Sequence, residues 1–222
     1  MSFGQLPYDV AHVLGGIMLL VSFMLLQRRS AASLINALAL QGVLLAAAAI
    51  WQGYVQGAPQ LYVTGLIALL AKGIAIPLVL RRMLGGALLH REPEGGLDST
   101  RAMLAGGLLV ALAILVVLPV TAGVQALARE DLAIALSILL LGLLMMLLRR
   151  GVLAQAAGLM IMENGLILGA VGVAGMPLVI ELSTAGLVLV VGMIAGLFGR
   201  LLHESFESQD TDVLHPHRGE AP

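Results

Sequence analysis

Seven apolar segments, each long enough to cross a lipid bilayer, follow one another along the sequence. A membrane-spanning helix needs about 20 mostly apolar residues. By that measure the expected spans are residues 8–27, 32–52, 60–82, 102–120, 132–148, 152–173 and 177–200. Only 11% of the 222 residues are charged, whereas about a quarter are charged in a typical soluble protein. The sequence therefore predicts an all-α, polytopic integral membrane protein with no large soluble domain.

Basic residues predict how these helices are oriented. If the N-terminus lies outside, Arg129 is the one basic residue in an outer loop, and Lys72 lies within a span. The other ten basic residues then lie inside: Arg28, Arg29, Arg81, Arg82, Arg91, Arg101, Arg149, Arg150, Arg200 and Arg218. Cytoplasmic loops are enriched in Lys and Arg, so we expect an outer N-terminus. The aromatic residues Tyr8, Trp51, Tyr54 and Tyr62 then mark the outer membrane surface.

Residues 25–49 resemble residues 147–171. Each segment has an apolar helix, a double arginine, a short break and a second helix with a polar residue inside it. An offset of 121–122 pairs Arg28 with Arg149 and Gln41 with Glu163. We predict two parallel three-helix repeats joined by a spacer helix, a repeat type found in transport proteins. The parts are 1–82 (first repeat), 83–131 (inner loop, spacer helix four and outer loop), 132–202 (second repeat) and 203–222 (polar cytoplasmic tail).

Two charged residues lie near the middle of predicted spans. Lys72 is in the third span and Glu163 is in the sixth. Half a span is about 15 Å long, so the lysine cannot easily reach the membrane surface. Ionisable groups at this depth usually face a bundle interior or a proton pathway. We therefore expect Lys72 and Glu163 to take part in a proton relay, and a static ion pair that locks the helices is the alternative.

Five further polar residues fall within or beside the spans. Glu181, near the outer end of the seventh span, suits either a proton path or the favourable charge at a helix N-terminus. His12, near the outer end of the first span, is a weaker proton-path candidate. Asn36, Gln41 and Asn164 are expected to form hydrogen bonds between helices.

Several classes of function are not supported by the sequence. The chain has no cysteine, so iron–sulfur clusters and thiolate metal sites on it are excluded. His215 and His217 alone make a poor metal site, and we expect no metal and no cofactor. We find no nucleophile–base set or phosphate loop, so we expect no independent catalytic residues. Nucleic-acid binding is also not expected, because the positions of the arginines are explained by the orientation of the helices in the membrane.

Three segments carry a resemblance to a known family. They are LLRRGVLAQAAGLMIMENGLIL (147–168), MPLVIEL (176–182) and LLAKGIAIPLVL (69–80), which contains Lys72. The sequence resembles the E-type membrane subunit of hydrogenase-4 and of related group 4 [NiFe] complexes over roughly residues 8–205. That family is similar to a duplicated K-type subunit of respiratory complex I, in which a glutamate after a double arginine belongs to the membrane proton path. Family members carry a further acid about six residues after the position of Glu181, and this sequence has none there.

The resemblance implies a cofactor-free, non-catalytic subunit of an oxidoreductase complex in the bacterial inner membrane, with a cytoplasmic C-terminus. It would pack between antiporter-like and anchor subunits, meet a peripheral redox module through its inner loops and contribute to proton translocation. One alternative is a C-type subunit of a multisubunit sodium/proton antiporter. A purely structural membrane scaffold and a self-contained small transporter are further alternatives, and the small number of central polar groups argues against the transporter.

Overall fold

The computed structural model describes residues 6–28, 30–88, 99–121, 126–149 and 151–172, together with Gly196. The elements are α1 (Leu6–Gln27), α2 (Ala31–Gln56), α3 (Pro59–Ile67), the π-helical segment η1 (Ala68–Ala75), α4 (Ile76–Leu88), α5 (Ser99–Val120), α6 (Ala126–Leu148) and α7 (Val152–Gly172). The described part is entirely helical, and it holds six helices long and apolar enough to cross a membrane. The all-α prediction is confirmed for this part. The seventh predicted span, residues 177–200, falls outside the described residues apart from Gly196.

Several helices extend beyond their predicted ends. Helix α2 continues to Gln56 and stops at Gly57, whose φ of 62° places it in the left-handed region that glycine adopts without strain. Helix α4 continues to Leu88, so the polar loop predicted to begin at residue 83 begins later. Helix α6 begins at Ala126 rather than at residue 132. The criterion of about 20 mostly apolar residues identifies only the part of a helix that lies in the hydrocarbon core. A helix can continue beyond that part into the membrane–water interface.

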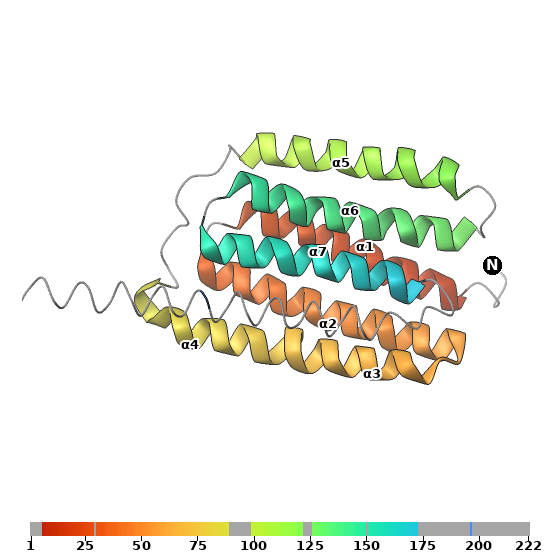
Figure 1. The fold of residues 1–222 in the computed structure, drawn as a ribbon, viewed down its shortest axis with the longest axis horizontal. Helices are drawn as coiled ribbons and strands as arrows, with labels where there is room; N and C mark the ends of the chain where they lie inside the picture. The colour runs from red at the N-terminus through yellow and green to blue at the C-terminus, as the bar shows by residue number, and fades with distance from the viewer. Residues whose placement is uncertain are drawn as a thin grey trace, which may run out of the picture.

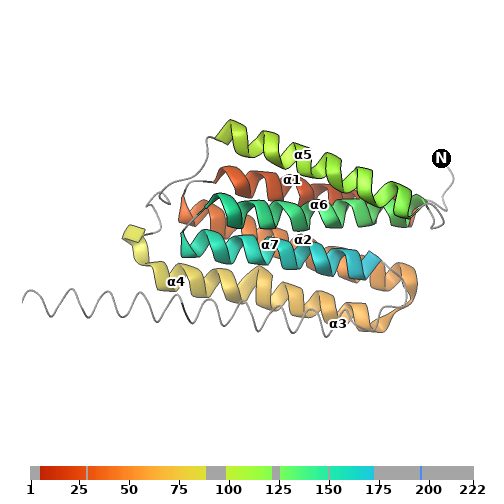
Figure 2. The same ribbon diagram turned by 45° about the horizontal axis from the view of Figure 1, so that its top comes forward.

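Two helical hairpins form the centre of the molecule. Helix α1 packs against α2, and α6 packs against α7 (Figures 1 and 2). The hairpins lie side by side, with α1 next to α6 and α2 next to α7. The segment α3–η1–α4 covers α2, and α5 covers α6. Since each connection reverses the chain direction, α1 runs parallel to α6 and α2 runs parallel to α7.

Glycines allow the closest helix contacts. A methyl group at Gly142 in α6 would lie 2.5 Å from the backbone nitrogen of Met162 in α7. A methyl group at Gly42 in α2 would lie 2.7 Å from the carbonyl carbon of Lys72 in η1. Small residues permit such close backbone approach, which is the usual way that membrane helices gain packing contacts. The polar centre described below depends on this closeness of α2 and η1.

Hydrogen bonds from Arg149 join the two hairpins at one end. Its Nη1 donates to the carbonyl of Arg28 at 2.6 Å, and its Nη2 donates to the carbonyl of Leu26 at 2.8 Å. The last carbonyls of a helix have no intrahelical donor, so Arg149 satisfies the end of α1 from the start of the α6–α7 connection. Arg149, predicted to serve topology, therefore also holds the hairpins together.

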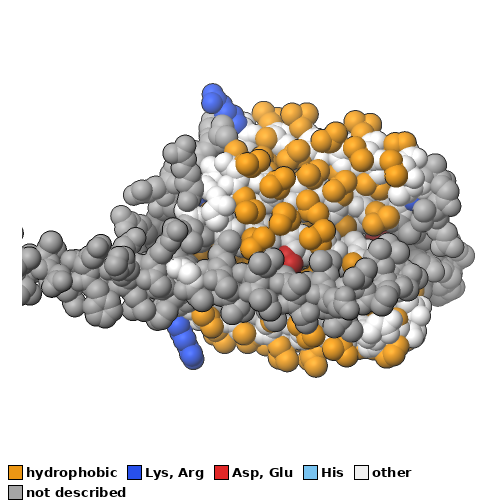
Figure 3. Space-filling view, viewed as in Figure 1, with side chains coloured by type: hydrophobic (Ala, Val, Ile, Leu, Met, Phe, Trp, Pro, Cys, Tyr) orange, Lys and Arg blue, Asp and Glu red, His pale blue; other side chains and the backbone are white. Residues whose placement is uncertain are grey.

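The outer surface of the helices is apolar. Hydrophobic side chains cover much of the face that includes α5 and α6, whereas basic side chains gather toward the left end of the view (Figure 3). Leu108 and Leu115 on α5 are 73% and 70% exposed. Monomeric soluble proteins rarely show a continuous apolar face of this kind. The surface fits contact with lipid or with other membrane helices.

We predict that Gly42→Ala lowers the free energy of unfolding by about 1–3 kcal/mol, the usual result of overpacking. The added methyl would force α2 away from the backbone of Lys72. Gly107→Ala on α5 is the matched control, because a methyl there meets nothing within 4 Å. Denaturant titration of the detergent-solubilised protein measures both variants. Equal stability of the two variants would contradict the packing described.

Candidate functional site

A buried ion pair lies at the centre of the helical assembly. Lys72 Nζ on η1 lies 2.8 Å from Glu163 Oε1 on α7. The two residues are only 2% and 5% exposed. The pair joins the first and second halves of the chain. The structure therefore brings together the two central residues that the sequence singled out.

Hydrogen bonds extend this pair across the bundle. Lys72 Nζ also donates to Asn164 Oδ1 at 2.8 Å, and Asn164 Nδ2 donates to Gln41 Oε1 at 3.1 Å. Gln41 Nε2 then donates to Ser22 Oγ at 2.8 Å, and Ser22 Oγ donates to the carbonyl of Met18 at 2.9 Å. Asn164, Gln41 and Ser22 are fully buried. A continuous polar chain, from Glu163 to the Met18 carbonyl, thus runs through α7, η1, α2 and α1.

Local distortion of the helix positions Lys72. Segment η1 is π-helical over Ala68–Ala75 and ends just before Pro77. Proline has no N–H, and its ring clashes with the carbonyl four residues earlier, here that of Gly73. Wider π-helical winding relieves such a clash, and π-helical turns are frequent at functional sites. The widened turn and the nearby Gly42 let the lysine side chain pass α2 and reach α7.

The carboxylate of Glu163 is only partly satisfied. Oε1 contacts Lys72, whereas no residue that the structure describes donates a hydrogen bond to Oε2. A buried, unpaired carboxylate oxygen is costly when the group is charged. A proton on the carboxyl group removes that cost. Protonation would in turn leave the buried charge of Lys72 unneutralised, so the protonation states of the two groups are linked.

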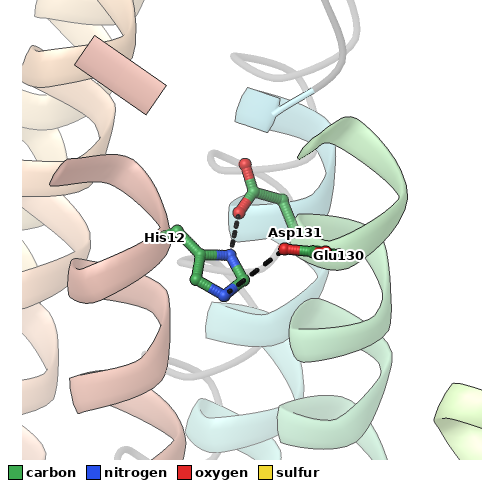
Figure 4. A network of polar contacts seen from close by, with 3 residues as sticks. All are labelled: His12, Glu130 and Asp131. Atoms are coloured by element: carbon green, nitrogen blue, oxygen red, sulfur yellow. Dashed lines mark hydrogen bonds and ion pairs between the residues drawn. The ribbon is translucent and has the colours of Figure 1, made fainter. Parts of the chain in front are cut away.

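His12 belongs to a second polar cluster near the start of α1. Its Nδ1 lies 3.3 Å from Asp131 Oδ1, and its Nε2 lies 3.7 Å from Glu130 Oε2 (Figure 4). Both acids come from the first turns of α6, so the cluster links the two hairpins. Neither Glu130 nor Asp131 was predicted from the sequence to belong to a site. The offset of 122 that pairs Gln41 with Glu163 also pairs Asp9 with Asp131. This repeat of an acid at equivalent positions was the one sequence feature that could have pointed to Asp131.

A small cavity lies beside Asp131, between the outer cluster and the polar chain. Its volume is about 10 Å³, and its lining includes Gly15 on α1, Gln52 on α2, Asp131 on α6 and Leu168 on α7. A space of this size holds roughly one water molecule when polar groups line it. The cavity is therefore suited to a single water next to the Asp131 carboxylate.

The remaining predicted residues lie elsewhere. Asn36 accepts a short hydrogen bond from Arg81 of α4, so it joins α2 to α4 away from the central chain. Glu181 lies outside the described residues, and its role stays a prediction. Ser22 was missed, because a serine in an apolar helix commonly bonds only to its own backbone. Within the described residues, no group of three or more His, Cys, Asp or Glu side chains is arranged to hold a metal ion.

Comparison with known proteins gives a distant similarity. The chain is 27% identical over 201 residues to the uncharacterized protein Rv0085 of Mycobacterium tuberculosis, a match that covers 90% of this chain and 91% of that protein. No protein-family model matches the sequence. No solved structure matches it either. Since the name of the relative states no activity, the functional proposal rests on the residues and their geometry.

We predict that Lys72→Met and Glu163→Leu each lower the free energy of unfolding by about 3–5 kcal/mol, because each leaves a buried partner unpaired. The double variant should recover most of the loss, since it removes both charges. Denaturant titration at neutral pH gives the coupling energy. Lys72→Met combined with Asn36→Leu is the control and should be additive. An additive loss in the Lys72–Glu163 double variant would contradict the pairing.

Proposed function

We propose that the chain is a membrane-arm subunit of a complex-I-like redox complex, of the group 4 hydrogenase or formate hydrogenlyase type, and that it contributes to proton translocation. The observation that carries the proposal is the buried Lys72–Glu163 pair, whose second carboxylate oxygen has no donor among the described residues. The resemblance of the segments around both residues to the E-type membrane subunit of hydrogenase-4 supports the same function.

Glu163 is the group that gains and loses the proton in this proposal. When Glu163 is ionised, Lys72 neutralises it, and when it is protonated, Lys72 retains its hydrogen bond to Asn164. The hydrogen bond to Asn164 offsets part of the cost of a lysine charge that Glu163 no longer neutralises. Intramembrane acids and bases that pair with one another in this way are typical of proton relays.

Ser22 and the His12 cluster mark a route toward the membrane surface. Ten residues of α1 separate His12 from Ser22, about 15 Å at 1.5 Å per residue. The small cavity beside Gly15 and Asp131 lies along that interval. A water molecule in the cavity would shorten the gap between the two polar groups. We therefore assign His12 and Asp131 to the outer end of the proton path and Glu163 to its centre.

The hairpin arrangement supports the parallel repeat. Helices α1 and α6 run side by side in the same direction, as do α2 and α7. Gln41 and Glu163, which the offset of 122 pairs, lie on the equivalent helices α2 and α7 and belong to one polar chain. A duplicated three-helix unit, with a spacer helix that restores the direction, accounts for this. The seventh span completes the second repeat in this proposal.

The distribution of charge supports the proposed placement in a complex. The chain would lie in the bacterial inner membrane with its N-terminus outside and its C-terminus in the cytoplasm, as the ten predicted inner arginines require. Antiporter-like and anchor subunits would contact its apolar faces. The peripheral redox module would meet the inner segments, which the sequence places at 83–101 and 203–222.

The test is purification of the native complex in mild detergent, followed by proton transport in membrane vesicles. We expect hydrogenase or formate-oxidising subunits to co-purify with the chain. Glu163→Gln should abolish proton transport while electron transfer and assembly persist, because an amide cannot carry the proton. Lys72→Met should lower transport strongly for lack of a balancing charge. Transport is followed with a pH-sensitive dye.

Asn36→Leu provides the control, since it removes a polar side chain that lies away from the central polar chain and should leave transport unchanged. Normal transport by both Glu163→Gln and Lys72→Met would contradict the proton relay and favour a purely structural role for the protein. Recovery of the chain with antiporter subunits alone would contradict the redox-complex assignment. Recovery as a homo-oligomer would contradict a subunit role altogether.

A further inference from the structure

An apolar groove lies between α5, α6 and α7, apart from the polar chain. Its volume is about 460 Å³, within the range of small-molecule sites. The lining residues include Val117 and Val120 on α5, Leu132 and Leu139 on α6, and Gly165 and Ala170 on α7. Small residues from α6 and α7, including Gly165 and Gly169, form part of this lining. The groove follows α6 for about 10 Å, from Leu132 to Leu139.

Arg129 lies just beyond one end of this groove and is not one of its lining residues. It is one turn of α6 before Leu132, and its Nη2 donates to the carbonyl of Leu118 on α5 at 2.8 Å. The buried Nε has no hydrogen-bond partner among the described residues. Arg129 is also the one basic residue that the predicted topology places at the outer side. The hydrogen bond to α5 accounts for the position of Nη2, but it does not provide a partner for Nε.

Neighbouring acids do not neutralise this arginine in the structure. Glu130 and Asp131 lie against His12 of α1 (Figure 4), whereas Arg129 reaches α5. Successive residues of an α-helix are rotated by about 100° around its axis. The two acids and the arginine therefore lie on different faces of α6. A cationic head at the end of an apolar groove within membrane-spanning helices matches one ligand class, a lipid with a phosphate and a long acyl chain.

We propose that this groove is a phospholipid-binding site. The acyl chain lies between α5, α6 and α7, and the partly exposed Arg129 side chain binds the phosphate. The depth of the groove along α6 is about a third of the roughly 30 Å hydrocarbon core, so it holds the part of the chain nearest the headgroup. A lipid held here fills the space between α5, which is otherwise largely exposed, and the α6–α7 hairpin.

The test uses phosphatidylglycerol that carries a photoreactive diazirine in its acyl chain, bound to the full-length protein in detergent. After illumination, peptide mass spectrometry should map the labels to 116–121, 132–139 and 165–170 in preference to the exposed face of α5 at 104–112. Native mass spectrometry with unlabelled phosphatidylglycerol gives the affinity. Arg129→Gln should weaken binding about tenfold, the usual effect of losing a charge-assisted hydrogen bond.

Two substitutions separate binding from folding. Ala170→Leu fills the groove without touching Arg129 and should remove the preferential labelling. Arg101→Gln and Ala111→Leu are the matched controls, since both residues are exposed on α5 and neither lines the groove. Both controls should bind as the wild type does. Uniform labelling of all exposed helices, or unchanged affinity in folded Arg129→Gln or Ala170→Leu protein, would overturn the proposal.

Discussion

The ion pair between Lys72 and Glu163 governs how the central helices pack against one another. Two charges placed inside apolar helices must find each other, because leaving either one unpaired is strongly destabilising. To meet, they require a distorted turn at η1, a glycine at position 42 and a close α2–α7 pairing. Much of the packing at the centre of the bundle can be understood as the means of holding this one pair.

Buried ion pairs contribute little net stability compared with a well-packed apolar core. The polar chain through Asn164, Gln41 and Ser22 makes the centre better satisfied, yet one oxygen of Glu163 still lacks a described donor. A purely structural pair would gain from satisfying that oxygen. An unsatisfied oxygen beside a positive charge instead suits a group that alternates between two protonation states, which is why we favour a proton relay over a lock.

The helices and the two central charged residues could be identified from the sequence because both depend on strong local signals, whereas the contact between these residues came from the structure. Long apolar segments require helices in lipid, and charged residues at mid-span are few, so Lys72 and Glu163 had few possible partners. The π-helical turn was not predicted. Ser22 and the His12–Asp131 contact depend on side-chain positions across 19 and 119 residues of separation, and hydrophobicity carries no information about such positions.

Difference infrared spectroscopy of the purified protein can show whether Glu163 changes its protonation state, because it reports the protonation of a single carboxyl group. Spectra are compared between mildly acidic and mildly alkaline buffer. We expect a carboxyl band that appears and disappears reversibly in the wild type, is absent in Glu163→Gln and shifts in Lys72→Met. A Glu163 that keeps one protonation state throughout, with unchanged spectra in both variants, would contradict the relay.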